Sequence, residues 1–423
     1  MKKTLADFNF FYSAFSLAAN YVTRCHYRHI VEQGKENIPW GEHFIIAPCH
    51  QNALMDPMLI LQSFHSYKNP VVFLARADIF RKPAIRAILT WLRISPVYRI
   101  RDGRDQLGRN EEIFNTAREV VEKGVPLCLM AEGRHNDKHQ LLPLVKGMFR
   151  IAGATQVELG DKPLYILPVG IDYDEYEKPM SSAVINYGKP IDIRAFAEMY
   201  QQNPPVALNQ MRDALTPALK GLMHHVESEE HYEEEFAYCH LMTQATLSKL
   251  DLDNDTWGRF QARRHISLQM AQLTEAEREK CYAQGAAFAD ECRRKGVPLW
   301  FASKNLSSVQ VGWTFVILVA FVALLSVSHL WGKWLISNLM VYLPTHLIPK
   351  YKIKDPQFRS SVNYGIRLVS QFLYTLVVAI IFWITQGFFA GLMISVFSIL
   401  SARFMPLLFA RLRDVYYYFR MII

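Results

Sequence analysis

Hydrophobic and polar positions along residues 40–190 alternate in a pattern that predicts short buried strands separated by helices. The predicted strands are apolar runs bounded by polar residues, glycine or proline: 44–48, 71–75, 96–100, 126–131, 165–171 and 183–187. The predicted helices carry apolar residues at three- and four-residue steps: 79–93, 110–123 and 146–157. Strands spaced by helices are typical of a layered α/β domain with a mostly parallel sheet.

An apolar face also predicts a helix at the N-terminus. Its apolar residues recur at helical spacing: Phe8, Phe11, Tyr12, Phe15, Ala19 and Val22. Polar residues interrupt the stretch, so it lacks the continuous apolar core of a signal peptide. Two interpretations stay open, a helix lying in the membrane interface and a helix packing on the α/β domain.

The pattern changes twice after the α/β region. Residues 201–305 predict helix throughout, and long apolar runs follow. About four of these runs are candidate transmembrane segments: 311–330, 334–349, 368–385 and 387–402. The second contains Pro344 and His346 and either crosses the membrane or is re-entrant. The chain is thus expected to have four parts: an amphipathic helix (1–24), the α/β domain (25–200), a helical region (201–305) and a transmembrane region (306–423).

Charge in the loops predicts the topology of the last region. Basic residues gather in the connection 350–367 and in the tail after residue 402, whereas the two opposite loops hold only Lys333. Because positive loops stay on the cytoplasmic side, four crossings place both basic segments and the α/β domain in the cytoplasm. In a bacterium the membrane would be the inner one.

The composition narrows the classes of partner. The formal net charge is +8, and no basic stripe interleaved with aromatic residues indicates a nucleic-acid partner. A positive balance beside membrane segments favours contact with anionic membrane lipid. The sequence indicates no oligomeric state.

The cysteine and histidine spacings predict neither a disulfide framework nor a metal site. The six cysteines are scattered, which fits reduced thiols in a cytoplasmic domain. His224 and His225 are adjacent, but no third ligand follows at a sensible spacing. We therefore expect no metal and no bound cofactor.

The first candidate for catalytic chemistry is His50, followed by Asp56. His50 comes directly after the predicted strand 44–48. A histidine whose ring is held by a carboxylate can take a proton from a hydroxyl group. No serine or cysteine motif accompanies the pair, so the hydroxyl could belong to the substrate. Chance pairs at this spacing are usually ordinary turn residues.

Two further clusters lie at the ends of predicted strands. Arg99 follows the run Pro96-Val97, and Glu132-Gly133-Arg134 follows the apolar run 127–131. Carboxyl ends of parallel strands meet at one edge of a sheet, so both arginines are expected near His50. Guanidinium groups suit phosphate oxygens. Each arginine alone is more often an ordinary surface residue.

Together these clusters resemble the glycerolipid acyltransferases of the lysophosphatidate and glycerol-3-phosphate acyltransferase type. Four blocks occur in the order typical of that family over residues 25–190: His50 to Asp56, Pro96-Val97-Tyr98-Arg99, Glu132-Gly133-Arg134 and Leu167-Pro168-Val169. The common pattern has four residues between the histidine and the aspartate, whereas this chain has five. It resembles the branch with five, which includes fungal glycerol-3-phosphate acyltransferases, so the acceptor cannot be inferred from the commoner members.

The resemblance implies a role for each residue of the first block. His50 acts as general base on the acceptor hydroxyl, and Asp56 holds its ring. Backbone amides after the His50 turn are candidate donors to the oxyanion. The acyl donor is acyl-CoA or acyl carrier protein.

The resemblance also implies the acceptor-binding residues. Arg99 and Arg134 bind the acceptor phosphate, with Lys146 as a third cation. Glu132 orients this group, and Gly133 allows the tight turn.

The acceptor stays open among glycerol 3-phosphate, 1-acylglycerol 3-phosphate, and an amino-acid lipid or other lysolipid. A different class also stays open, a non-catalytic lipid-binding or transport protein whose main part is the transmembrane region. Acyl-chain length is not indicated.

Overall fold

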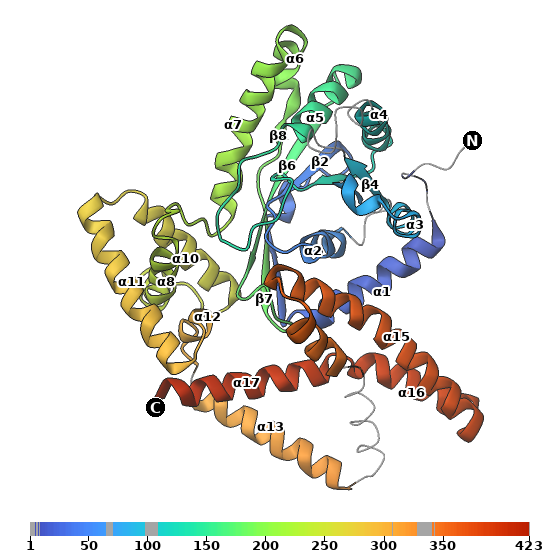
Figure 1. Ribbon diagram of the computed structural model, residues 1–423, viewed down its shortest axis with the longest axis vertical. Helices are drawn as coiled ribbons and strands as arrows, with labels where there is room; N and C mark the ends of the chain where they lie inside the picture. The colour runs from blue at the N-terminus through green and yellow to red at the C-terminus, as the bar shows by residue number, and fades with distance from the viewer. Residues whose placement is uncertain are drawn as a thin grey trace. The chain divides into compact units, whose positions relative to one another are not determined.

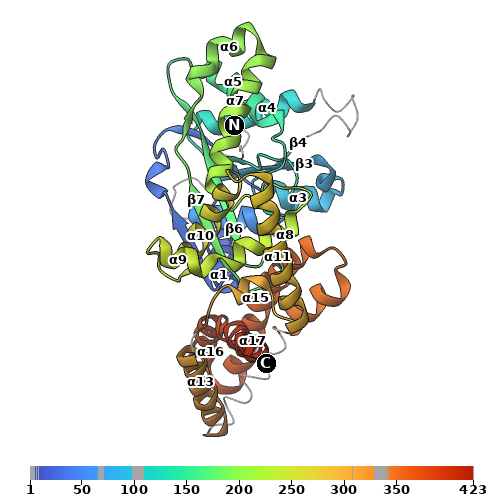
Figure 2. The same ribbon diagram turned by 90° about the vertical axis from the view of Figure 1, so that its left-hand side faces the viewer.

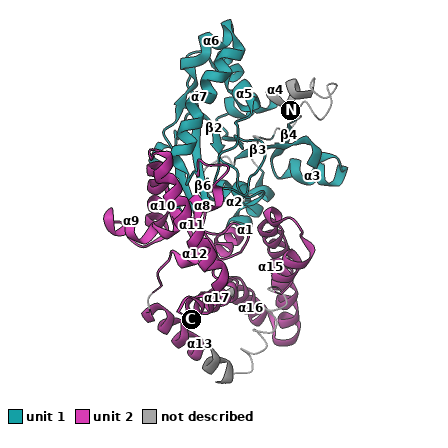
Figure 3. Ribbon diagram, turned by 60° about the vertical axis from the view of Figure 1, so that its left-hand side comes forward, with its two compact units in different colours: residues 1–20, 31–172, 184–225 teal, residues 21–30, 173–183, 226–423 magenta. Residues whose placement is uncertain are grey.

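The computed structural model describes most of the chain as two compact units. The described residues are 9–64, 71–97, 109–306, 308–327 and 343–422, together with Leu5, Asp7 and Val341. Unit 1 comprises Met1–Asn20, Val31–Asp172 and Val184–His225 (Figure 3). Unit 2 comprises Tyr21–Ile30, Tyr173–Ala183 and Val226–Ile423.

The sheet is mixed but mostly parallel, which confirms the predicted α/β class. Its strand order is β1-β7-β6-β2-β5-β3-β4, with β8 paired to β6. The pairs β6–β2, β2–β5, β5–β3 and β3–β4 are all parallel, and β8 is antiparallel to β6. The strands are β1 His29–Gln33, β2 His43–Pro48, β3 Val72–Arg76, β4 Ile94–Val97, β5 Leu127–Leu129, β6 Leu164–Tyr173, β7 Ser182–Tyr187 and β8 Ile191–Asp192.

The six predicted strands correspond to β2 through β7. Strand β1 was not predicted because it is an edge strand, with polar residues at both ends and no fully buried position. Strand β8 has two residues, too few to show a period. The end of the predicted strand 96–100 lies outside the described residues.

Helices cover both faces of the sheet in unit 1 (Figure 1). They are α2 Met55–Ser63, α3 Pro83–Trp91, α4 Arg109–Glu122, α5 Lys146–Leu159, α6 Ala197–Gln202 and α7 Pro204–Leu222. On one face, Ile45 and Ala47 of β2 share a core with α4, α5 and α7. Phe44 points to the opposite face by strand alternation, where it contacts Phe64 at the end of α2. Strand β2 is therefore buried on both faces, as its continuous apolar run indicates.

Helix α1 (Phe10–His26) supports both interpretations of the N-terminal segment in part. Tyr12 and Phe15 pack edge-on against Trp91 of α3. Phe10 and Phe11 stay 69% and 74% exposed. Phe8 lies outside the described residues.

The helical region after residue 200 continues from α7 into unit 2. Its helices there are α8 Tyr232–Leu241, α9 Thr243–Lys249, α10 Thr256–Met270, α11 Glu275–Lys295 and α12 Leu299–Ala302. Helices α8 and α11 pack closely (Figure 2), and a Cβ on Gly285 of α11 would lie 2.0 Å from the carbonyl oxygen of Glu234.

Two C-terminal helical stretches are long and apolar enough to cross a membrane, by length and composition. They are Pro356–Gln386 and Phe388–Ile422, and they contain α15 Arg359–Gln386, α16 Phe388–Ser401 and α17 Phe404–Ile422. The predicted segment 311–330 falls largely on α13 (Ser308–Val327), whose candidate apolar helix is the shorter Ser308–Ala320. Much of the predicted segment 334–349 lies outside the described residues, and its crossing stays a prediction.

The predicted basic connection 350–367 is wrong in its second half. Helix α15 begins at Arg359, and Arg367 is buried inside it. The Arg367 guanidinium donates to the carbonyls of Cys25 and Ala402, at 2.8 and 2.5 Å. Both carbonyls lie at helix ends, where the helix itself leaves them without partners. Arg367 therefore caps two helices and cannot be counted as a loop charge.

Candidate active site

Strand β2 delivers His50 to the carboxyl edge of the parallel sheet. Pro48 is the last residue of β2 and pairs with Val169 of β6. The N–H of Cys49 donates to the Val169 carbonyl (3.0 Å), and the N–H of Ala131 donates to the Pro48 carbonyl (3.1 Å). The turn at His50 and the loop after β5 are thus held side by side.

His50 and Asp56 form the pair that the sequence predicted. Nδ1 of His50 donates to Oδ2 of Asp56 across 2.7 Å. The same oxygen accepts the N–H groups of Gln51 and Asn52, at 2.9 and 2.8 Å. Asp56 is fully buried, and the His50 side chain is 12% exposed. With Nδ1 donating, Nε2 carries the lone pair that can accept a proton.

Helix α2, which the sequence did not predict, explains how Asp56 reaches the ring. Pro57 lies in the first turn of α2, where proline is tolerated because no intrahelical N–H bond is lost. The carbonyl of Asn52 accepts the N–H groups of Met55 and Asp56 and closes that turn. A carboxylate is also favoured at the positive end of a helix. The turn folds the intervening residues back, so Asp56 lies against His50.

The expectation for the oxyanion donors is wrong for the first two amides after His50. The N–H groups of Gln51 and Asn52 both donate to Asp56. They hold the carboxylate and are not available to a substrate oxygen.

Glu132 joins the His50 turn to the following loop and does not face a phosphate. Its Oε1 accepts the backbone N–H of His50 and its Oε2 that of Leu142, each at 2.7 Å. Burial raises the pKa of Glu132 to about 8, although these two N–H groups oppose the shift. The predicted orienting role fits this geometry, whereas direct phosphate binding by Glu132 does not.

Gly133 occupies a backbone conformation that other residues rarely adopt. Its φ is +65°, and a Cβ there would lie 2.9 Å from Cγ1 of Val145. Only glycine allows this turn without strain. The turn sends the chain back to the site, where the N–H of Asn136 donates to the His50 carbonyl (3.0 Å).

The predicted cations have different standing in the structure. Arg134 is exposed in the loop that Glu132 ties to His50. Lys146 is exposed at the first residue of α5, and the N–H of its neighbour Val145 donates to the Ala131 carbonyl (2.9 Å). Arg99 lies outside the described residues, so its role stays a prediction.

His135 is a site residue that sequence reasoning missed. Its ring centroid is 5.5 Å from that of His50, with the planes 81° apart. In the sequence, only its position directly after Gly133-Arg134 indicated a place near the site.

Cys49, beside His50, is not suited to act as a nucleophile. The thiol is fully buried, and its sulfur bonds the backbone N–H and carbonyl of Ile171. Burial raises the pKa of Cys49 well above its ordinary value, so the reactive thiolate is disfavoured.

Comparisons with known proteins match the part of the chain that holds this site. Residues 29–172 match the family model described as Acyltransferase. A 90-residue stretch is 31% identical to an uncharacterized acyltransferase of Schizosaccharomyces pombe. That match covers 21% of this chain and 13% of the yeast protein. Residues 29–172 are therefore similar to acyltransferases, in agreement with the resemblance that the four sequence blocks carry.

A search of solved structures found the 1-acyl-sn-glycerophosphate acyltransferase PlsC from Thermotoga maritima. The two are 20% identical with a TM-score of 0.33, over 48% of this chain and 80% of that one.

Proposed function

We propose that this chain transfers a fatty acyl group from a carrier thioester to the hydroxyl group of a glycerol phosphate acceptor at a membrane. The acceptor is glycerol 3-phosphate or 1-acylglycerol 3-phosphate, and the donor is acyl-CoA or acyl-acyl carrier protein. The observation that carries the proposal is the 2.7 Å bond from His50 Nδ1 to buried Asp56, which leaves Nε2 as the base.

The transfer requires one proton to pass from the acceptor hydroxyl to His50 and then to the leaving thiolate. Nε2 of His50 takes the proton from the acceptor hydroxyl as its oxygen attacks the thioester carbonyl carbon. The carbon–sulfur bond then breaks, and the leaving thiolate takes the proton from the imidazolium. Asp56 stabilises the positive ring between the two events. No covalent acyl-enzyme is needed, in keeping with the buried Cys49 thiol.

Positive charge near the site supports an acceptor with a phosphate group. Arg134 is exposed close to the Glu132 bridge, and Lys146 begins α5, where the helix dipole also favours an anion. We propose that both bind the phosphate, together with Arg99 as the sequence predicts.

Exposed apolar residues support a membrane location for unit 1. Phe10 and Phe11 of α1 are exposed, and so are Ile85 and Ile88 of α3, which are 41% and 57% exposed. Such residues favour insertion at the interface, where a monoacyl lipid resides. With the two candidate spans, they support an integral membrane protein. We propose from the charges of the sequence's loops that the catalytic domain faces the cytoplasm.

The test is an assay of the purified full chain in lipid vesicles with labelled donor. Acyl-CoA and acyl-acyl carrier protein are each offered with glycerol 3-phosphate, 1-acylglycerol 3-phosphate and an amino-acid lipid. Transfer to a phosphate acceptor, lost in His50→Ala, supports the proposal. Preference for the amino-acid lipid would move the acceptor class, and no transfer to any acceptor would favour a lipid-binding or transport protein.

A further inference from the structure

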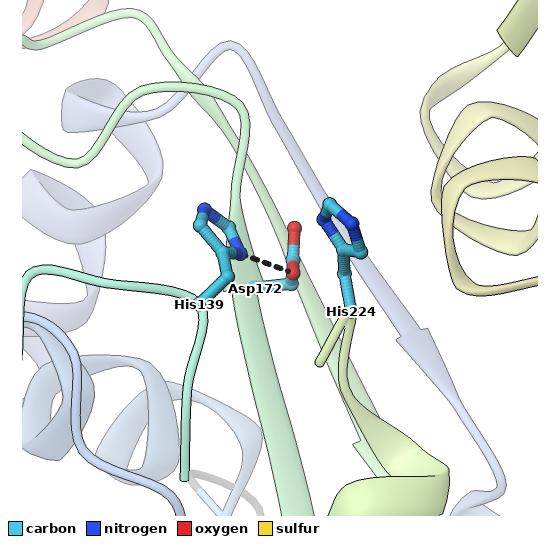
Figure 4. A group of neighbouring side chains, drawn as sticks. All are labelled: His139, Asp172 and His224. Carbon is cyan, nitrogen blue, oxygen red and sulfur yellow. Dashed lines mark hydrogen bonds and ion pairs between the residues drawn. The ribbon is translucent and has the colours of Figure 1, made fainter. Parts of the chain in front are cut away.

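We propose that His139, Asp172 and His224 form a binding site for a divalent transition-metal ion, with Zn²⁺ as the best match. One potential ligand atom from each residue lies within 4.8 Å of the other two. The three residues are 8%, 2% and 0% exposed. Figure 4 shows Asp172 between the two imidazoles.

Close packing of α7 on β6 places two of the three residues side by side. Asp172 is near the end of β6, and His224 lies two residues after α7. A Cβ on Gly170 would lie 2.2 Å from the carbonyl oxygen of Leu222, so only glycine lets this helix end approach the strand. The Leu222 carbonyl also accepts the side-chain amide of Asn186 (3.1 Å). His224 is therefore brought to Asp172 by the backbone itself.

His139 arrives from the loop 131–145, which also carries Glu132. Its Nδ1 is 3.2 Å from Oδ2 of Asp172. Two residues on, the N–H of Leu141 donates to Nδ1 of His225 (3.2 Å). The loop is thus fastened to the segment after α7 as well as to β6.

The set of potential ligands and the distance between His139 and Asp172 both match zinc. Two imidazoles with one carboxylate are a common protein ligand set for this ion. Metal–ligand bonds of 2.0–2.2 Å put two ligands of a tetrahedral ion about 3.4 Å apart. The His139–Asp172 separation of 3.2 Å is close to that value. A small rotation of the His224 ring completes the set, with water in the fourth position.

The metal would pin the loop 131–145 and would touch no substrate. Among the described residues, this loop holds Glu132 and His135 beside His50, and it also carries Arg134. The ligands are 33 and 52 residues apart along the chain, which is why the His224-His225 pair showed no third ligand in the sequence. The proposal does not depend on the proposed acyl transfer, since its readout is bound metal.

The test measures metal bound to the purified full chain. Protein stripped with a chelator is reloaded with Zn²⁺, washed and analysed by mass spectrometry for metal per chain. We expect one ion in the wild type and a loss of most of it in Asp172→Asn and His224→Ala. The matched control is His43→Asn, at the opposite end of β2, which keeps a nitrogen donor near the Val121 carbonyl and should retain the ion.

A second measurement does not depend on whether the variants fold. X-ray absorption at the zinc edge of the wild type should show nitrogen and oxygen ligands with imidazole scattering and no sulfur. Sulfur ligands would place the ion at cysteines and overturn the proposal. A wild type that retains no metal would also overturn the proposal, and the three residues would then be only a hydrogen-bonded histidine–aspartate cluster. Equal metal content in wild type and well-folded Asp172→Asn would overturn it as well.

Discussion

The imidazole of His50 and the carboxylate of Asp56 are joined by a 2.7 Å hydrogen bond, although five residues separate them in the chain. The backbone also holds the carboxylate in place, because its Oδ2 accepts two backbone N–H groups of the same turn. The imidazole is therefore held in one tautomer. Such a pair has the geometry expected of a general base.

Loss of the Asp56 charge should lower the rate of acyl transfer while leaving the protein folded. Asp56→Asn keeps the shape and an acceptor oxygen but no longer stabilises the imidazolium. We expect kcat to fall by about 10²–10⁴-fold, the range of general-base contributions. Steady-state kinetics with labelled donor measure it, and the exposed Asp137→Asn is the matched control. Activity of Asp56→Asn within threefold of wild type would contradict the role.

Arg134 should act on the acceptor and not on the donor. Arg134→Ala removes a charge-assisted bond of about 1.5–3 kcal/mol, so kcat/KM for the acceptor should fall roughly ten- to 150-fold. The donor KM should change little. Arg150→Ala, which removes another exposed arginine of the same domain, should leave both unchanged. A change confined to the donor KM would show that Arg134 binds the acyl donor and not the acceptor.

The buried carboxyl of Glu132 should make stability depend on pH. Burial raises its pKa to about 8 in the folded chain, whereas the unfolded value is about 4.3. Between these values the folded state holds a proton that the unfolded state has released. Stability should therefore fall as pH rises through this window, by at most about 1.4 kcal/mol per pH unit.

The measurement is the thermal midpoint from pH 5 to about pH 8, the folded-state pKa, for wild type and Glu132→Gln. The variant lacks the ionisable group and should show a shallower slope, although its midpoint is lower because one backbone N–H loses its acceptor. Equal slopes in the two proteins would mean that Glu132 is ionised throughout.

Gly133 should be more sensitive to alanine than another glycine with the same φ. Gly133 and Gly124 have φ of +65° and +69°, but only at Gly133 would a Cβ clash, with Val145. Gly124→Ala should cost about 1–2 kcal/mol from the left-handed conformation alone, and Gly133→Ala more. Adding Val145→Ala should recover the difference. The midpoint of chemical unfolding measures each variant, and equal costs would show that the loop moves aside.

The sequence predicted the parts of the site that follow from local pattern. The apolar runs of β2, β5 and β6 are buried on both faces, and His50 and Glu132 lie two and three residues after the ends of β2 and β5. Helix α2 was not predicted because it is buried at consecutive positions from Leu59 to Ser63 and so lacks a one-sided apolar period. His135 was missed because its neighbour in space is 85 residues away in the chain.

Long-range contacts account for the other differences. Arg367 satisfies helix-end carbonyls from two distant segments, and no charge count along the chain indicates that. The bonds from Glu132 to His50 and Leu142 likewise depend on how loop 131–145 folds back. Such pairings depend on tertiary structure and leave no period in the sequence.

The most direct test of the account is the rate of acyl transfer by purified His50→Ala in vesicles, with His43→Asn as the control. His43 lies at the other end of β2, away from the site. We predict that His50→Ala loses about 10²–10⁴-fold in kcat while its thermal midpoint and membrane insertion stay near those of wild type, and that His43→Asn keeps its activity. A folded His50→Ala protein that transfers acyl groups at a near-normal rate would contradict the central claim.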